Sequence, residues 1–222
     1  FPDADPVHAA KGAAALKFLN AGQACISPNR LYVPDTLRAA FEETLCSRVE
    51  KLQTGNGMED GVGVGPLVND SAVAKVERQV EDAREKGAGV PIGGARLTEG
   101  DHANGHFFAP TVLTDVNDEM AIYREETFGP VAPVISYEDP EQVVQLANDT
   151  NYGLAAYVYT RDISVAMRAF EGLRFGIIGI NDVNPTSASV PFGGMGDSGV
   201  GREGGHEGIS EYLETKTGGF AI

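Results

Sequence analysis

The chain has 222 residues, 42% of them hydrophobic, and its 32 acidic residues against 17 basic ones give a net charge of −15. This length is enough for one large hydrophobic core or two small ones. The acidity argues against nucleic-acid and anionic-membrane partners, which need basic surfaces, and indicates a solvated exterior. No apolar run approaches the roughly 20 residues of a membrane span, and no signal segment opens the chain. Two cysteines without a disulfide framework indicate a reducing compartment, so we expect a cytoplasmic protein.

Strands and helices are predicted to alternate along the sequence. Asp5-Pro6 and Asp139-Pro140 are typical of helix starts, and Asp35 and Asp162 are expected to cap two more helices. The predicted helices cover residues 7–20, 71–86 and 139–148, with two others starting at 35 and 162. The predicted strands cover residues 29–33, 89–92, 107–112, 131–137, 154–159 and 176–180, and the predicted loops cover 55–66 and 93–106.

Three of these helices have an apolar face at helical spacing. The residues expected to face inward are Leu37, Phe41, Leu45, Val49 and Leu52 in the second helix, Val73, Val76, Val80 and Ala83 in the third, and Ile163, Met167 and Phe170 in the helix after Asp162. The alternation predicts an α/β fold with a largely parallel sheet and flanking helices. Residues 211–222 are interpreted as a helix end followed by an extended tail.

Cys25 follows a polar, glycine-containing corner at the end of an alanine-rich run. A thiol becomes a nucleophile as thiolate, with access to substrate and with backbone amides nearby that stabilise developing negative charge. Asn20, Gly22 and Gln23 would form such a corner. The alternative from the residues alone is an inert, buried cysteine, which is also how Cys46 in the second helix is interpreted.

Three motifs in order connect this corner to a known family. Residues 18–25 resemble the F-x-N-x-G-Q-x-C signature of the aldehyde dehydrogenase superfamily, and residues 125–131 resemble its E-E-x-F-G-P-V motif. Residues 191–194 and 198–203 resemble its P-F-G-G and S-G-x-G-R-E segments. The resemblance covers essentially the whole chain, and residues 125–133 and 147–159 look most like the succinate-semialdehyde dehydrogenase branch.

The resemblance implies a role for several residues. Cys25 would be the nucleophile that attacks an aldehyde, with its backbone N–H forming half of an oxyanion hole. Glu126 and Phe128 would contact the nicotinamide riboside of NAD or NADP. Asn181 ends a segment that resembles the family's G-x-x-x-[IV]-N pattern, and it is expected to organise a loop, with a direct catalytic role as the alternative. Residues expected to line the substrate site are Leu19, Phe192 and Ser187. Core packing is the alternative for Phe192, and simple solvation is the alternative for the Ser187 hydroxyl. The four histidines show no metal-ligand spacing, so no metal is expected.

The resemblance also predicts the domain organisation. Residues 1–210 would form the nucleophile-bearing catalytic domain, and residues 211–222 a tail that serves as an oligomerisation strand in a homodimer or homotetramer. The dinucleotide-binding domain, the general-base glutamate and the asparagine of the oxyanion hole would lie upstream of Phe1. As isolated, the chain is therefore expected to be inactive.

Three positions depart from the semialdehyde branch. Leu19 stands where the branch has an arginine that can bind a distal carboxylate, Ser27 replaces a second cysteine, and Gly196-Asp197 stand where lysine is common. The substrate therefore stays open between semialdehydes and other aldehydes. Two other functions also stay open: a coenzyme-A-acylating relative, and a domain that acts only in binding or assembly.

Overall fold

The computed structural model describes all residues from 1 to 222, and its largest sheet has four strands in the order β1-β8-β7-β4. Strands β1, β8 and β7 run parallel, whereas β4 pairs antiparallel with β7 at the edge. The strands are β1 (Leu31–Pro34), β4 (Gly89–Ile92), β7 (Thr111–Thr114) and β8 (Val131–Tyr137). The predicted α/β fold is confirmed, and the antiparallel edge strand makes this sheet a mixed one.

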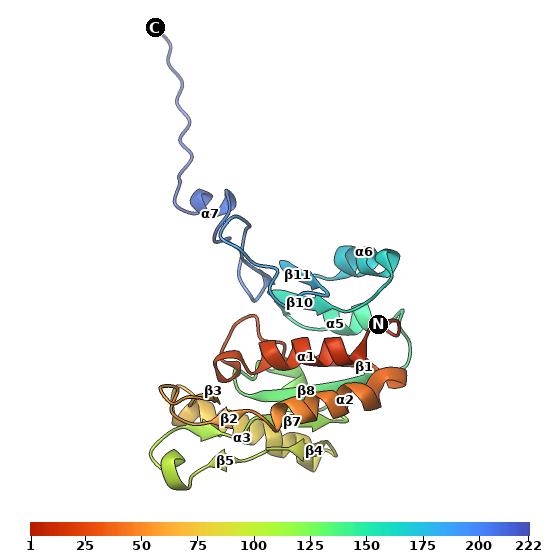
Figure 1. Cartoon of the computed structure of the whole chain (residues 1–222). Coiled ribbons are helices and arrows are strands. Elements are labelled where there is room, and N and C mark those ends of the chain that lie inside the picture. The colour runs from red at the N-terminus through yellow and green to blue at the C-terminus, as the bar shows by residue number, and fades with distance from the viewer.

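Helices pack along this sheet, and α1 and α2 lie side by side (Figure 1). The N-terminal cap of α1 is Asp5, whose carboxylate accepts hydrogen bonds from the Val7 and His8 N–H groups. Asp35 lies inside the first turn of α2 and caps nothing, so its predicted capping role is wrong; there it complements the helix dipole instead. The helices are α1 (Pro6–Lys17), α2 (Asp35–Val49), α3 (Asp70–Glu85) and the short α4 (Ala121–Arg124).

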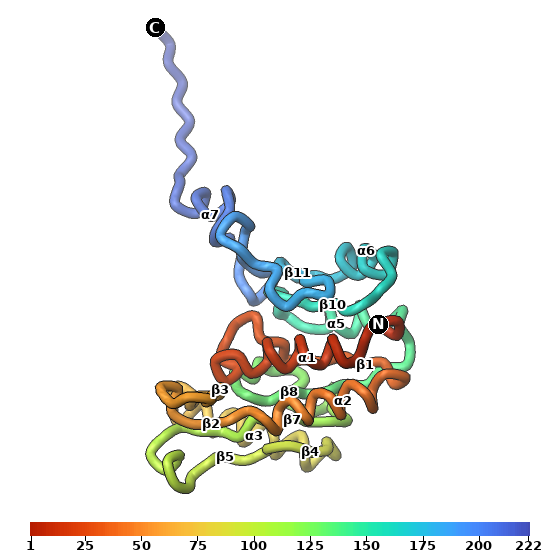
Figure 2. The backbone as a smooth tube through the Cα atoms, in the orientation of Figure 1, coloured from red at the N-terminus to blue at the C-terminus, as the bar shows by residue number.

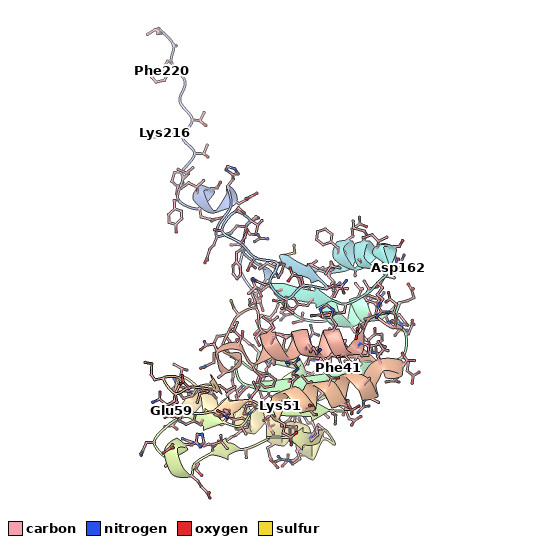
Figure 3. All side chains as sticks on the ribbon, in the orientation of Figure 1. Phe41, Lys51, Glu59, Asp162, Lys216 and Phe220 are labelled. Atoms are coloured by element: carbon pink, nitrogen blue, oxygen red, sulfur yellow. The ribbon has the colours of Figure 1, made fainter.

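The main hydrophobic core is a cluster of 27 buried residues between these helices and the sheet. Helix α2 contributes Phe41, Leu45 and Val49, and the predicted face of α3 is entirely buried. Leu37 and Leu52, at the two ends of the α2 stripe, are only partly buried against the cluster. Phe41 is labelled on α2 in Figure 3. The periodicity of both helices therefore predicted their buried faces well.

Two predicted regions have a different local structure. The strand expected over residues 107–112 is divided at Ala109-Pro110, where proline has no N–H to donate to a ladder. Both predicted loops contain short paired strands, because residues with little local pattern still pair with neighbours brought to them by the fold. The additional elements are β2 (Gln53–Thr54), β3 (Val62–Val64), β5 (Arg96–Leu97), β6 (Phe107–Phe108) and the 3₁₀ turn Gly100–His102.

A smaller unit follows in the chain, built on the parallel pair β10 (Ala155–Val158) and β11 (Ile177–Ile180). Its helices are α5 (Val143–Asn148) and α6 (Ile163–Gly172), and its core is a cluster of three buried residues. The predicted helix over 139–148 begins only at Val143. Strands β9 (Tyr152–Gly153) and β12 (Met195–Gly196) pair antiparallel beside it.

The predicted inward face of α6 is wrong. Ile163, Met167 and Phe170 are 74%, 49% and 53% exposed, whereas Ala166 and Ala169 are buried. The buried face runs through 166, 169 and Leu173, because small alanine side chains let the helix lie close to the narrow two-stranded sheet. The larger residues occupy the neighbouring face, which nothing in this chain covers.

The C-terminal segment leaves the body of the molecule. After α7 (Glu207–Ser210) the chain runs on as an extended, exposed tail that pairs with no other segment, and its trace is seen at the top of Figure 2. Figure 3 places Lys216 and Phe220 on this tail, away from both units. No helix in the structure combines the length and the apolar character that a membrane span needs.

Strands β1 and β10 each have one edge without a neighbouring strand, and both strands line the same cavity of about 520 Å³. The cavity lies between the two units and is walled mostly by hydrophobic side chains. At one end, the backbone nitrogen of Phe1 donates a hydrogen bond to the Tyr159 carbonyl, 2.9 Å away. The two sheets therefore share no strand, and a cavity lies between their facing edges.

We expect truncation of the buried Leu45 in α2 to cost more stability than truncation of the exposed Phe170 in α6. Leu45→Ala removes a fully buried group from the main core and should lower the free energy of unfolding by about 3 kcal/mol. Phe170→Ala removes an exposed ring and should cost less than about 1 kcal/mol. Urea denaturation of both variants measures the difference. Equal losses would contradict the placement of α6.

Candidate active site

The segment before Cys25 turns through three successive left-handed residues. Helix α1 ends at Lys17, earlier than predicted, and Asn20, Ala21 and Gly22 then adopt φ values of 50°, 58° and 74°. Residues other than glycine rarely adopt this backbone conformation, and such strain persists only where surrounding contacts enforce it. The corner is therefore held by its surroundings instead of by its own preferences.

The polar residues of the corner supply part of that support. The Asn20 side chain donates to the Gln23 carbonyl at 3.0 Å, and the Gln23 side chain donates back to the Asn20 carbonyl at 3.1 Å. Gln23 also donates to the Pro66 carbonyl at 3.2 Å and accepts from the Val68 N–H at 2.9 Å. These two side chains thus fix the backbone of the corner, and Gln23 ties it to a distant loop.

A backbone crossing completes the support. A Cβ atom at Gly22 would lie 2.1 Å from the Gly129 carbonyl oxygen, so only glycine fits at this position. Gly129 belongs to the second motif, whose Phe128 is also left-handed at φ 50°. Two segments far apart in sequence are therefore pressed together backbone to backbone.

Cys25 is exposed at the end of the corner and borders two hollows. Its backbone N–H takes part in no backbone hydrogen bond. Nearby, the Tyr157 hydroxyl donates to the Ile26 carbonyl at 3.1 Å, and burial, together with the Cys25 thiol, raises the pKa of Tyr157. An accessible thiol beside an unused N–H is the arrangement that addition to a carbonyl group requires.

The second motif presents one free carboxylate to the same cavity. Both Glu125 and Glu126 border it with Cys25. Glu125 forms an ion pair with Arg78 and accepts from Gln79 at 3.2 Å, so its charge is already balanced. The half-buried Glu126 uses only its backbone carbonyl, which Gln79 contacts at 3.5 Å. Its carboxylate is therefore free to accept hydrogen bonds from a ligand such as a diol.

The structure brings some of the remaining predicted residues to the hollows and leaves others outside. Phe192 borders the second hollow together with Cys25, and its backbone pairs with Glu203 in both directions at 2.7 Å. Leu19 is 54% exposed and borders neither hollow. Ser187 also lies outside both and shares a hydrogen bond with Ser189 at 2.9 Å. Phe128 is half-buried and follows the segment that carries Glu126, but it does not border the cavity.

Two motif residues have structural contacts. The Asn181 side chain both accepts from the Thr160 N–H and donates to its carbonyl, at 3.1 and 2.8 Å, which joins the ends of β10 and β11. Arg202 donates to the Gly194 and Gly201 carbonyls at 2.8 Å. Both contacts organise loops around the site. No group of three or more His, Cys, Asp or Glu side chains lies close enough to share a metal ion.

Sequence reasoning missed Lys17. This residue ends α1 and is fully buried, although its Nζ has no hydrogen-bond partner. A lysine in the last turn of a helix is ordinarily a solvated group that complements the helix dipole. The available signal was its position directly before the corner motif.

Comparison with known proteins gives a consistent result. The sequence model described as the aldehyde dehydrogenase family matches residues 1–218. The chain is 49% identical over 216 residues to a succinate-semialdehyde dehydrogenase [NADP(+)] of Escherichia coli, covering 97% of this chain and 44% of that protein. It is 47% identical over 215 residues to an aspartate-semialdehyde dehydrogenase (non-phosphorylating) of Halomonas elongata, covering 97% and 43%.

Solved structures extend the similarity to the fold. A succinate-semialdehyde dehydrogenase from Burkholderia pseudomallei superposes with a TM-score of 0.91 at 46% identity, over 96% of this chain and 43% of that one. A betaine aldehyde dehydrogenase from Staphylococcus aureus in complex with NAD⁺ superposes with a TM-score of 0.91 at 39% identity, over 96% and 42%. The chain thus spans less than half the length of the proteins it matches.

The backbone crossing predicts a position-specific penalty for alanine. Gly22→Ala should lower the free energy of unfolding by about 2–4 kcal/mol, because the added Cβ meets the Gly129 carbonyl and the residue is left-handed. Gly65→Ala is the matched control, since nothing lies within 4 Å of its Cβ and its φ is ordinary. Chemical denaturation compares them, and a Gly22→Ala variant as stable as the control would refute the crossing.

Thiol labelling should separate the two cysteines. Cys25 is exposed, whereas Cys46 is partly buried and its pKa is raised by burial and by Glu42 and Glu50. Iodoacetamide at neutral pH should therefore modify Cys25 at least about tenfold faster. Mass spectrometry of the Cys25→Ser and Cys46→Ser variants assigns each rate. Similar rates in the folded chain would be the contrary result.

Proposed function

The chain belongs to the aldehyde dehydrogenase family, and we propose that it is the nucleophile-bearing part of an NAD(P)-dependent enzyme that oxidises a semialdehyde to the acid. The observation that carries this proposal is the exposed Cys25 at a strained corner, beside its own unused N–H and on one cavity with the free carboxylate of Glu126. Because the relatives are more than twice as long, the activity is proposed for the complete protein that contains this chain.

In this proposal Cys25 forms the covalent intermediates. Its thiolate adds to the carbonyl carbon of the aldehyde, and the carbonyl oxygen takes up negative charge that the Cys25 N–H stabilises. Oxidation of this adduct to a thioester requires a hydride acceptor, which is the chemistry that a nicotinamide supplies when bound. Water then releases the acid and restores the thiol.

The residues present fit a nicotinamide cofactor. Glu126 has a carboxylate without an ion-pair partner, which can accept hydrogen bonds from the two hydroxyls of a ribose. The neighbouring Glu125 is neutralised by Arg78, so the pair does not present two unbalanced charges to the ligand. Phe128 does not border the cavity, so its proposed role as the aromatic wall beside the ring would need a shift of this segment when the cofactor binds. NAD and NADP both remain open, because one relative is named for NADP(+) and one solved neighbour holds NAD⁺.

A carboxylated substrate is proposed from the relatives, whose names include succinate and aspartate semialdehydes. Phe192 is proposed as a wall of the substrate site, and Leu19 and Ser187 would have to be brought near it by the rest of the protein. The arginines at the two hollows already have partners: Arg30 and Arg202 donate to carbonyls, and Arg124 to Asp149. A cation for the distal carboxylate is therefore expected from outside this chain.

We also propose the organisation of the complete protein. Residues 1–210 would be its catalytic domain and residues 211–222 an intersubunit strand in a homodimer or homotetramer, since the extended tail has no partner strand in its own chain. The two free cysteines are compatible with the reducing cytoplasm.

The test is NAD(P)H formation by the complete gene product with succinic semialdehyde and with butanal, a neutral aldehyde of the same chain length. We expect a kcat/KM at least about tenfold higher for the semialdehyde, the size of one charge-assisted hydrogen bond. Cys25→Ala should abolish turnover without unfolding the protein, and Cys46→Ala serves as control.

The outcomes separate the two parts of the proposal. Preference for butanal would retain an aldehyde dehydrogenase and reject the semialdehyde as substrate. Undiminished turnover in Cys25→Ala would reject the assignment of the nucleophile.

A further inference from the structure

The Glu126 carboxylate borders the cavity with Cys25 but has no hydrogen-bond or ion-pair partner in the chain. Its place is therefore set by its backbone and not by contacts of the side chain itself. A group that must meet a particular part of a ligand has to be held within about 0.5 Å of the productive geometry, and surrounding residues normally supply that restraint. The residues that fix the Glu126 backbone thus decide where this carboxylate lies.

The peptide group between Glu126 and Thr127 is contacted from both sides by amide side chains. The Thr127 N–H donates to the Asn29 Oδ1 atom at 3.2 Å. The Glu126 carbonyl points the opposite way, as in any trans peptide, and lies 3.5 Å from the Gln79 Nε2 atom. The shorter of the two contacts is the stronger hydrogen bond, so Asn29 is the main restraint on the plane of this peptide.

The Asn29 contact satisfies an N–H group that has no other partner. Thr127 is fully buried, its N–H takes part in no backbone hydrogen bond, and its hydroxyl oxygen is also without a partner. Buried backbone N–H groups are almost always hydrogen-bonded, so without the Asn29 oxygen this N–H would be unpaired or would turn toward another acceptor. A turn of this peptide changes the direction of the Glu126 side chain, which is attached to it.

Asn29 belongs to the loop that carries the nucleophile. It lies four residues after Cys25 and two before strand β1, is half-buried and borders the cavity. Its neighbour Arg30 is anchored by hydrogen bonds from its guanidinium to three carbonyls of another segment, at 2.8 to 3.2 Å. The bond from Thr127 to Asn29 therefore ties the carboxylate segment to a fixed part of the thiol loop, at a second point beside the backbone crossing.

We propose that Asn29 is a positioning residue for Glu126: its Oδ1 atom holds the Glu126–Thr127 peptide so that the carboxylate meets the ribose of a bound nicotinamide cofactor. This inference rests on the proposed function of Glu126. It assigns a role to a residue outside the three motifs. It also makes one loop responsible both for the place of the thiol and for the place of the cofactor.

The experiment measures the dissociation constants of NADH and NADPH in the complete protein, from the fluorescence of the nicotinamide. Asn29→Ala removes the acceptor and should raise the dissociation constant about tenfold. Asn29→Asp keeps an acceptor oxygen at the same place and should bind as the wild type does. Asn56→Ala is the matched control, because Asn56 also accepts from a backbone N–H, that of Met58 at 3.1 Å, but is exposed and borders neither hollow.

A double-mutant cycle with Glu126→Ala shows whether Asn29 acts through the carboxylate. If it does, Asn29→Ala should weaken binding when Glu126 is present and should add nothing in the Glu126→Ala background. A merely structural role would lower the unfolding temperature and leave the affinity of the folded protein unchanged. Losses of affinity that add in the double variant would overturn the inference.

The cycle also separates this inference from the proposed function. If Glu126→Ala binds the cofactor as the wild type does, the role proposed for Glu126 is wrong, and the role of Asn29 falls with it. If Glu126→Ala binds more weakly while Asn29→Ala keeps the wild-type affinity, or if Asn29→Asp binds as weakly as Asn29→Ala, only the role of Asn29 is overturned. Thermal unfolding identifies a misfolded Asn29→Ala, in which case Asn29→Leu, which fills the space of the amide without its oxygen, takes its place.

Discussion

The crossing of Gly22 over Gly129 is the contact on which the site depends. It presses the corner before Cys25 against the segment that carries Glu126, at a distance that excludes any side chain at Gly22. Ala21 and Phe128, one on each side of the crossing, are both left-handed. Neither segment would hold this strained conformation without the contact between them. The Cys25 thiol and the Glu126 carboxylate therefore border the same cavity because their two backbone segments are in contact. The two side chains do not contact each other.

Around this crossing, each polar group of the motifs has one of two uses. Asn20 and Gln23 use their amides on backbone groups, and Glu125 uses its charge on Arg78. The groups left over include the Cys25 thiol with its N–H, the Glu126 carboxylate and the buried Thr127 hydroxyl. A site of this kind is preorganised, because the supporting residues are already satisfied before a ligand arrives.

The sequence predicted the features that are local or carried by motifs. Helices α2 and α3 have long apolar stripes, so their buried faces could be predicted, and the motifs identified the family. The predicted buried face of α6 was wrong because this helix has two adjacent apolar stripes. Only the packing partner determines which of the two is buried. The short strands β3 and β5 have no local signal, since their partners are supplied by the fold.

The site was predictable to the same extent. Cys25 and Glu126 came from motifs and border one cavity, whereas Leu19 and Ser187 border neither hollow, so the roles expected for them stay predictions. Lys17 could not be found from spacing, because burial of a helix-terminal lysine is decided by the segments that close over it.

The hollow between β1 and β10 also determines how this chain opens. No strand-to-strand hydrogen bond joins the two sheets, and the core cluster of the smaller unit has three buried residues, compared with 27 in the main core. Regions with little buried apolar surface exchange their amide hydrogens through local fluctuations, at free energies below that of global unfolding. We therefore expect the β10–β11 unit to open before the main core, and since Cys25 and Leu154 border the same hollows, such an opening would also loosen one wall beside the thiol.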